Sequence, residues 1–234
     1  MLSTIVGHEQ VFERFRRALK RRRLSSTFLF VGPPGVGKRQ VANRIAQCLL
    51  CEANAEERLE ACGECPGCTM FQAGTHPDFT TVSKPPDRTF IPLELFIGDR
   101  EHRMQEGLCY DISLKPFRGG RKVAVIDDAD YLNVEGANCL LKTLEEPPPR
   151  SILILIGTSE QKQLPTIRSR CQTVRFRPLE TEALARLIVE QGITDSHEEA
   201  MTLTELAGVG LINRISGSGL NPELSNCPAR VSFT

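Results

Sequence analysis

The stretch FLFVGPPGVGKRQVANRIA, residues 28–46, decides the fold of this chain. Together with Thr27 it begins with an apolar run, TFLFV (27–31), that predicts a buried strand. Glycines and prolines then predict a tight turn, and KRQVANRIAQCLL (38–50) has the apolar spacing of an amphipathic helix. A strand, a glycine-rich turn and a helix in this order are typical of a phosphate-binding loop. A chance Gly-Pro turn before a helix is the alternative.

In such a loop the backbone N–H groups converge on phosphate oxygens, and the helix dipole adds a positive potential. Gly32, Gly35 and Gly37 permit that backbone, and Lys38 is placed to reach the terminal phosphates. We therefore expect the nucleotide-binding residues to be Gly32, Pro33, Pro34, Gly35, Val36, Gly37, Lys38 and Arg39. Arg39 departs from the usual pattern, because Ser or Thr at this position supplies the hydroxyl that holds Mg²⁺.

A pair of acids, Asp127 and Asp128, supplies the second half of the predicted site. They follow the apolar strand pattern that begins KVAVIDDAD (122–130). At such a strand end the first acid orients Mg²⁺ and the second polarises the attacking water, whereas two aspartates that cap a turn are the structural alternative. Asp128 is shorter than glutamate, so its carboxylate retreats by about 1 Å, which can cost about a hundredfold in rate. With Arg39, this predicts impaired hydrolysis and leaves binding of ATP with Mg²⁺ open.

The rest of the sequence alternates predicted strands and helices, which favours an α/β fold with a parallel sheet. Further strands are expected at 78–83, 151–157 and 172–176, and helices at 8–20, near 100–113 and at 134–146. We expect one nucleotide-binding domain over residues 1–178. A small helical lid should follow over 179–208, incomplete, and then an irregular tail over 209–234.

Four of the nine cysteines, Cys51, Cys62, Cys65 and Cys68, have the spacing C-x10-C-x2-C-x2-C. Two overlapping C-x2-C steps are what tetrahedral Zn²⁺ coordination by thiolates requires, and four thiolates leave no open position. We therefore expect a structural Zn²⁺ module over residues 51–68, the alternative being free surface thiols. Cys48 is assigned to the predicted helix 38–50 by its helical periodicity. The isolated cysteines are expected to be ordinary small buried or half-buried residues; they are Cys109, Cys139, Cys171 and Cys227.

Composition and charge narrow the class of protein. Hydrophobic residues make up 40% of the 234 residues and the formal net charge is zero, which is typical of a soluble globular protein. The sequence has neither the run of about 18 apolar residues of a membrane helix nor a secretion signal, so we expect a cytoplasmic protein. Seven of the ten residues from Arg14 to Arg23 are basic. A solvated helix end is favoured there over contact with DNA phosphates.

Taken together, several stretches resemble the bacterial DNA polymerase III clamp-loader subunits of the gamma/tau and delta-prime type, within the AAA+ ATPases. These stretches are IVGHEQVFERFRRAL, FLFVGPPGVGKR, the four-cysteine module, HPDF (76–79), KVAVIDDADYLN, GANCLLKTLEEPPP and LPTIRSRCQTVRF. They span residues 5–178, about three quarters of the chain. The resemblance implies an AAA+ fold, a hetero-oligomeric ring with other clamp-loader subunits, and contact with the sliding clamp and with primer-template DNA through that complex. It implies no membrane.

The resemblance also implies roles for two further residues. Thr158, after the apolar run 151–157, resembles the sensor of the terminal phosphate. Arg170, in Ser-Arg-Cys, resembles the arginine finger that a subunit offers to its neighbour's nucleotide. From composition alone, Arg170 would be a surface arginine in an ion pair. The expected catalytic set is therefore Arg170, Asp127, Asp128 and Thr158.

The family contains two roles. Gamma-type subunits hydrolyse ATP, whereas delta-prime-type subunits keep the arginine finger and have lost their own working site. Arg39 and Asp128 favour the second role, as a component of the polymerase III holoenzyme with at most a weak ATPase activity of its own. A gamma/tau-type ATPase is the first alternative, and an unrelated phosphate-loop regulator with a zinc module is the second.

Overall fold

The most apolar run of the sequence forms the central strand of the sheet, β4 (Ser151–Gly157), and all seven of its residues are buried. The structure, a computed structural model, describes residues 7–118, 120–190 and 192–204. In that part of the chain the sheet has the strand order β2-β3-β4-β1-β5, and every neighbouring pair is parallel. The other strands are β1 (Thr27–Val31), β2 (Phe79–Val82), β3 (Lys122–Ile126) and β5 (Gln172–Arg175). The parallel α/β sheet expected from the sequence is confirmed.

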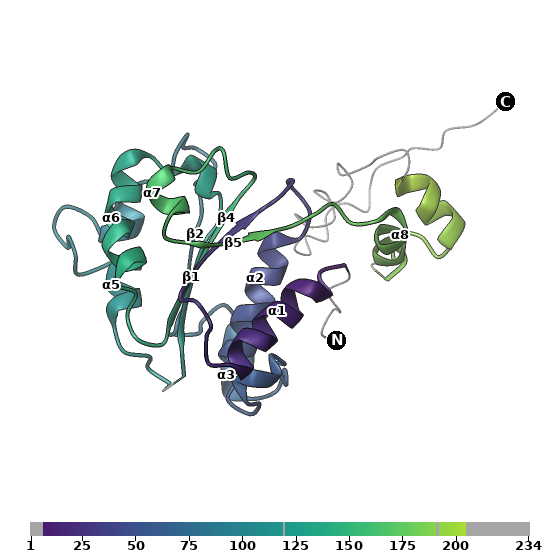
Figure 1. Cartoon of the computed structure of the whole chain (residues 1–234), viewed down its shortest axis with the longest axis horizontal. Coiled ribbons are helices and arrows are strands. Elements are labelled where there is room, and N and C mark those ends of the chain that lie inside the picture. The colour runs from purple at the N-terminus through teal and green to yellow at the C-terminus, as the bar shows by residue number, and fades with distance from the viewer. Residues whose placement is uncertain (1–6, 119, 191, 205–234) are drawn as a thin grey trace.

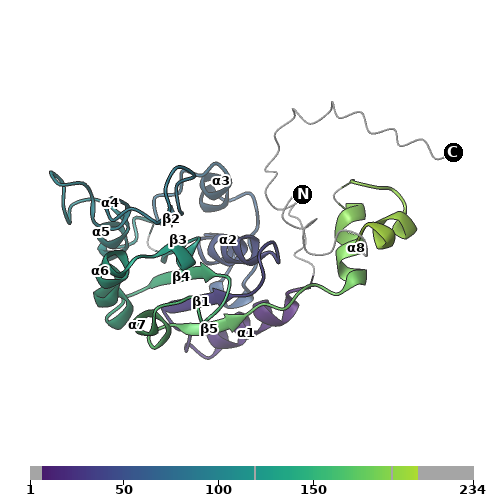
Figure 2. The same ribbon diagram turned by 90° about the horizontal axis from the view of Figure 1, so that it is seen from above.

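Helices cover both faces of this sheet (Figures 1 and 2). One face carries α1 (Glu9–Lys20) and α2 (Lys38–Leu49), with α3 (Pro66–Gln72) packed against α2. The other face carries α4 (Glu94–Ile97), α5 (Leu108–Ser113), α6 (Val134–Glu145) and α7 (Pro165–Arg168). Two 3-10 turns lie at Glu56–Arg58 and Ala129–Tyr131. Among the helices that the structure describes, none is long and apolar enough to cross a lipid bilayer.

Residues 28–31 of β1 are all apolar, rather than alternating with polar ones, because both faces of the strand are buried. Phe28 and Phe30 point into the core on the α1 and α2 side, whereas Leu29 and Val31 point into the core on the other side. Successive side chains of a strand face opposite ways, so a strand covered on both faces needs apolar residues throughout. The ring of Phe15 in α1 lies 4.6 Å from the ring of Phe28, centroid to centroid, which anchors α1 on the sheet.

The sequence predicts a single helix near residues 100–113, and the first half of this prediction is wrong. Only α5 is helical there, and residues 98–107 form a loop after α4. Gly98 and Gly107 have φ values of +79° and +88°, and a Cβ on Gly107 would lie 2.8 Å from the backbone nitrogen of Gly98. The loop therefore closes where two glycine backbones touch, and only glycine tolerates that combination. Helical periodicity does not encode such a closure.

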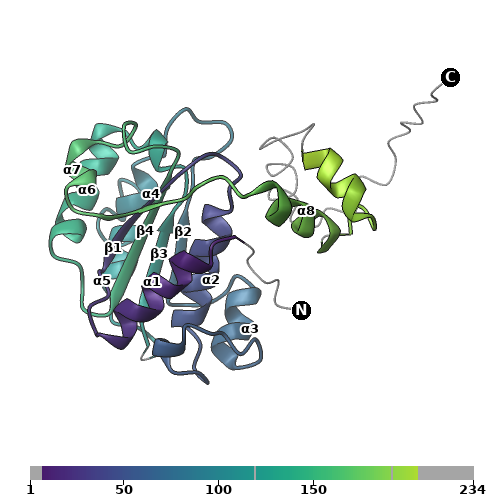
Figure 3. The same ribbon diagram turned by 45° about the vertical axis from the view of Figure 1, so that its right-hand side comes forward.

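Beyond the sheet, the helical segments expected after Pro178 are present as α8 (Thr181–Glu190) and as residues 197–204. They share a small apolar core that is separate from the two cores of the sheet and comprises Leu184, Ala185, Ile188 and Ala200. Figure 3 shows them to one side of the sheet, after β5. A domain boundary at residue 178 stays a prediction, and the tail expected over 209–234 lies outside the described residues.

Candidate functional site

The glycine-rich loop lies between β1 and α2, at the carboxyl end of the sheet. Gly37, the residue before α2, has φ +93°, which disfavours any side chain. A Cβ on Gly32 would lie 2.5 Å from the carbonyl oxygen of Phe176, so only glycine allows the chain after β5 to pass this close. Val36 is buried, and its carbonyl oxygen accepts a hydrogen bond of 2.6 Å from Nε2 of the buried His8. His8, which sequence reasoning missed, thus supports the loop from the protein side.

A cavity of about 860 Å³ opens beside this loop. Its volume lies in the range typical of small-molecule sites, about 300–1,000 Å³. The predicted site residues that line it are Pro34, Gly35, Gly37, Lys38, Arg39, Asp127, Asp128 and Thr158. Gly32, Pro33 and Val36 are not among the lining residues and shape the loop instead. The structure thus brings residues from three separate stretches of sequence to one cavity.

Lys38, the first residue of α2, is 7% exposed. Its Nζ donates hydrogen bonds of 2.7 Å to the carbonyl oxygens of Gly32 and Pro33. Burial lowers the pKa of the Lys38 ammonium, and the nearby Asp127 and Asp130 carboxylates act in the opposite direction. The cation is therefore held across the loop, in the position from which a lysine of this kind reaches phosphates.

Arg39 and Asp127 form an ion pair across the cavity wall. Nη1 of Arg39 lies 3.4 Å from Oδ2 of Asp127, while Oδ1 of Asp127 accepts a hydrogen bond of 3.0 Å from the backbone N–H of Asp128. Burial, with the neighbouring Asp127 charge, raises the pKa of the Asp128 carboxyl. The guanidinium of Arg39 therefore lies beside the first acid, and it belongs to the sequence position at which the usual pattern has a hydroxyl.

Thr158, the expected sensor, is fixed by a third acid. Its backbone N–H and its Oγ1 both donate to Oδ2 of Asp130, at 2.9 and 2.5 Å, and Gln163 Nε2 donates to Oδ1. Sequence reasoning stopped at Asp127 and Asp128 and missed Asp130. The signal was present, since Asp130 is the third acid of IDDAD and lies two residues beyond the pair.

Arg170 lies at the opposite end of the sheet from the loop. The Oγ1 of Thr27, the first residue of β1, donates a hydrogen bond of 2.8 Å to the Arg170 carbonyl oxygen, whereas the loop follows the last residue of β1. Five residues of strand span about 16 Å. The Arg170 guanidinium donates through Nε to Glu145 Oε1 at 2.8 Å and through Nη1 to the carbonyl oxygen of Thr166 at 2.9 Å. Arg170 is thus outside the cavity that the other expected catalytic residues share.

The four cysteines with metal-ligand spacing come together. The sulfur atoms of Cys51, Cys62, Cys65 and Cys68 all lie within 4.8 Å of one another. Cys65 precedes α3 and its Sγ accepts hydrogen bonds of 3.4 Å from the backbone N–H groups of Cys68 and Glu52. Burial acts to raise the pKa of Cys65, but these hydrogen bonds outweigh it and lower that pKa to about 6. Four clustered thiols with a readily ionised member fit a divalent metal ion of soft ligand preference.

The comparisons with known proteins agree on one family. The family described as DNA polymerase III, delta subunit, matches residues 7–180. The chain belongs to this family. DNA polymerase III subunit delta' of Pseudomonas aeruginosa is 34% identical over 199 residues, which are 84% of this chain and 57% of that protein. Subunit tau of Bacillus subtilis is 28% identical over 230 residues, 98% of this chain and 38% of that protein.

Among solved structures, the Thermotoga maritima RuvB Holliday junction branch migration motor superposes with a TM-score of 0.53 at 16% sequence identity. The match covers 91% of this chain and 61% of that one, and it shows the fold alone. The resemblance to DNA polymerase III clamp-loader subunits and the AAA+ fold are therefore confirmed. The chain spans about half the length of the curated delta' relatives that it matches.

In this family member a buried acid ties the cysteine module to the sheet. Asp78, in the HPDF stretch before β2, is 1% exposed. Its carboxylate accepts from the backbone N–H groups of Phe117 and Arg118, at 2.7 and 2.9 Å, and lies 3.5 Å from Lys122 Nζ. The Arg118 side chain pairs in turn with Glu52, next to the first cysteine of the cluster. The segment before β3 is thus fixed both to β2 and to the cysteine module.

Replacement of Asp78 by alanine should lower the free energy of unfolding by about 3–5 kcal/mol, because it leaves the buried Lys122 ammonium without its carboxylate partner and two backbone N–H groups without their acceptor. Denaturant unfolding followed by circular dichroism measures this. The matched control is Asp87→Ala, at an exposed aspartate, with an expected change below about 0.5 kcal/mol. Equal stabilities of the two variants would contradict the role assigned to Asp78.

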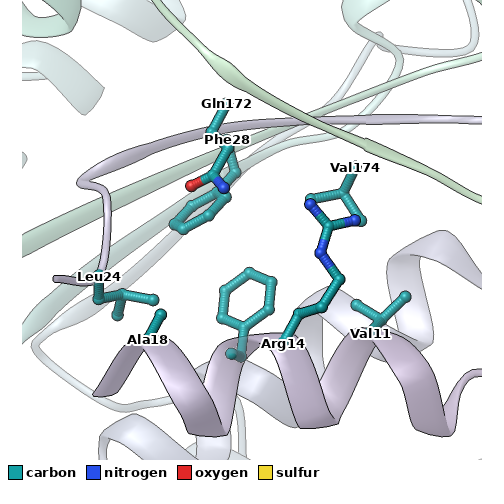
Figure 4. Close-up of a pocket in the computed structure, with 8 residues that line it drawn as sticks. Val11, Arg14, Ala18, Leu24, Phe28, Gln172 and Val174 are labelled. Carbon is teal, nitrogen blue, oxygen red and sulfur yellow. The ribbon is translucent and has the colours of Figure 1, made fainter. Parts of the chain in front are cut away.

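The cysteines outside the cluster and a second, smaller hollow are not part of the candidate site in the described part of the chain. Cys48 in α2 is buried. Cys109 is buried and Cys139 and Cys171 are half-buried, as expected, and burial raises the pKa of Cys171 to about 12; Cys227 lies outside the described residues. Figure 4 shows the hollow between α1 and the neighbouring strands, with Arg14 reaching toward Val174. It measures about 20 Å³, room for about one water molecule, and is too small for a cofactor.

Proposed function

We propose that this chain is a delta'-like subunit of a DNA polymerase III clamp loader, which lends Arg170 to the ATP site of a neighbouring subunit and hydrolyses little or no ATP itself. The observation that carries the proposal is the placement of Arg170 at the opposite end of β1 from its own loop. An arginine there is too far from the chain's own cavity to act on a nucleotide bound in it. It is available to a nucleotide that another chain holds.

The chemistry of phosphoryl transfer explains what such an arginine does. Negative charge spreads over the transferred phosphoryl group in the transition state, and a guanidinium placed beside it stabilises that charge. The Ser-Arg-Cys turn between α7 and β5 sets the Arg170 backbone, while Glu145 and the Thr166 carbonyl hold the side chain. In the assembled complex the neighbour's phosphates would replace Glu145 as the acceptor.

The chain's own cavity supports the second half of the proposal. Arg39 stands where the metal-binding hydroxyl is expected, and Asp128 where the longer glutamate is expected. The identity of 32–34% to the delta' relatives, against 28–32% to tau and tau/gamma relatives, points the same way. The gamma/tau role stays the alternative, because Lys38 and the cavity are kept.

Within this proposal the partners are the other subunits of a hetero-oligomeric ring and, through the complex, the sliding clamp and primer-template DNA, in the cytoplasm. The domain division stays as expected from the sequence, with residues 1–178 as the AAA+ domain. The metal held by the four cysteines is Zn²⁺, because four thiolates fill a tetrahedral shell and leave no place for substrate. Its role is then structural.

The isolated chain tests the proposal. With saturating ATP and Mg²⁺, its turnover should equal that of the Lys38→Ala variant, because neither can hold the metal and the water in working positions. Added to the cognate ATP-hydrolysing subunit, the chain should increase turnover. Phosphate release in a coupled assay measures both. Lys38-dependent turnover by the isolated chain would reject the proposal in favour of the gamma/tau role.

A further inference from the structure

The residues around Asp127 do not fit the Mg²⁺ that a phosphate-binding loop ordinarily uses. Mg²⁺ requires near-octahedral oxygen ligands at about 2.0–2.1 Å. Arg39 offers no oxygen, and its Nη1 lies 3.4 Å from Oδ2 of Asp127. The other oxygen, Oδ1, already accepts from the backbone of Asp128. A fixed positive charge thus stands beside the acid that would face the metal.

The charges that line the cavity balance without a metal ion. Three cations line it, Lys38, Arg39 and Lys162, and so do three carboxylates, Asp127, Asp128 and Asp130. The carboxylate of Asp130 already accepts hydrogen bonds from the Thr158 backbone and hydroxyl, so its role is structural. A polyphosphate that enters meets a lysine and an arginine at the loop, where an ordinary site offers a lysine and a metal ion.

The Arg39 side chain is placed to bind a phosphate group directly. Its side chain is 60% exposed and lines the cavity, so the guanidinium is free to turn from Asp127 toward a ligand. A guanidinium donates two parallel hydrogen bonds to phosphate oxygens and keeps its charge at every physiological pH. It therefore supplies the neutralising charge that a metal ion supplies elsewhere.

We infer that this cavity binds a nucleoside di- or triphosphate without a divalent cation, and that Mg²⁺ weakens this binding. Mg²⁺ bound to the phosphates would be repelled by the positive charge of Arg39. It would also occupy the phosphate oxygens to which the guanidinium donates hydrogen bonds. The inference rests on the proposed function only in assigning nucleotide to this cavity, and it is independent of Arg170.

Calorimetric titration of the full chain with ADP, and separately with ATP, in EDTA or in excess Mg²⁺ at equal ionic strength tests the inference. Wild-type protein should bind about tenfold more tightly in EDTA than in Mg²⁺. Arg39→Thr restores the hydroxyl and removes the charge, so the order should reverse to tighter binding in Mg²⁺. Arg39→Lys keeps a cation and should keep the wild-type order.

The matched control is Arg44→Thr on the same helix, where Arg44 donates to Gln47 and is not among the cavity residues. It should behave as wild type under both conditions. Binding by the wild type only in Mg²⁺, an unchanged order in Arg39→Thr, or the absence of binding in both conditions would overturn the inference. None of these results decides whether Arg170 serves a neighbour's nucleotide, because the turnover measurements on the complex test that role separately.

Discussion

Replacement of Arg170 by alanine should reduce ATP turnover at the neighbouring site by about 10³-fold or more, while the complex still assembles. The expected effect is large because the guanidinium is proposed to face charge that develops only in the transition state. To isolate the site, the complex should carry alanine at the loop lysine of its other ATP-hydrolysing subunits. Single-turnover phosphate release then reports the one site that Arg170 faces.

Two variants separate this role from a merely structural one. Arg168→Ala, two residues earlier on the exposed side of α7, should leave turnover unchanged. Arg170→Lys keeps the charge without the planar fork and should recover only part of the rate. Assembly is checked for each variant by size-exclusion chromatography. Undiminished ATP turnover in an assembled Arg170→Ala complex would contradict the proposal.

One Zn²⁺ per chain is the second expected result, and Cys65→Ser should reduce the metal content to zero. The cysteine module contributes Leu59, Ala61 and Cys68 to the core that α2 shares, all of them buried. Loss of the metal therefore exposes apolar surface as well as separating the thiols. We expect a loss of about 3 kcal/mol or more, or roughly 6–12 °C in Tm for a domain of this size.

Inductively coupled plasma mass spectrometry measures the metal, and thermal unfolding measures the stability. Cys139→Ser is the control, because this half-buried cysteine on α6 is not part of the cluster. It should keep one Zn²⁺ per chain. Protein purified without chelator that contains no zinc, or a Cys65→Ser variant that keeps it, would show that the cluster has another purpose.

Local patterns in the sequence predicted the elements that build the site. The β1 strand was expected at 27–31 and the α1 helix at 8–20, and the structure places them at Thr27–Val31 and Glu9–Lys20. Apolar runs and periodicity are sufficient there because burial on two faces leaves few alternatives. The C-x2-C steps predicted the cysteine cluster for a similar reason, since close spacing in sequence limits the distance in space.

Contacts between distant residues could not be predicted in the same way. The hydrogen bond from His8 to Val36 and those from Thr158 to Asp130 each join positions 28 residues apart, and no spacing rule specifies them. Three short helices were also missed: α3, which starts at a proline after a cysteine, and α4 and α7, each a single turn. None of them is long enough to display a helical period.

The separation of Arg170 from the cavity by the length of β1 has a consequence for how activity depends on concentration. An enzyme completed within one polypeptide keeps its specific activity on dilution. Under the proposed function the arginine and the phosphate it serves belong to different chains, so catalysis that uses Arg170 is second order until the subunits associate. Specific activity should therefore fall as the subunits are diluted, and that fall reports the strength of their association.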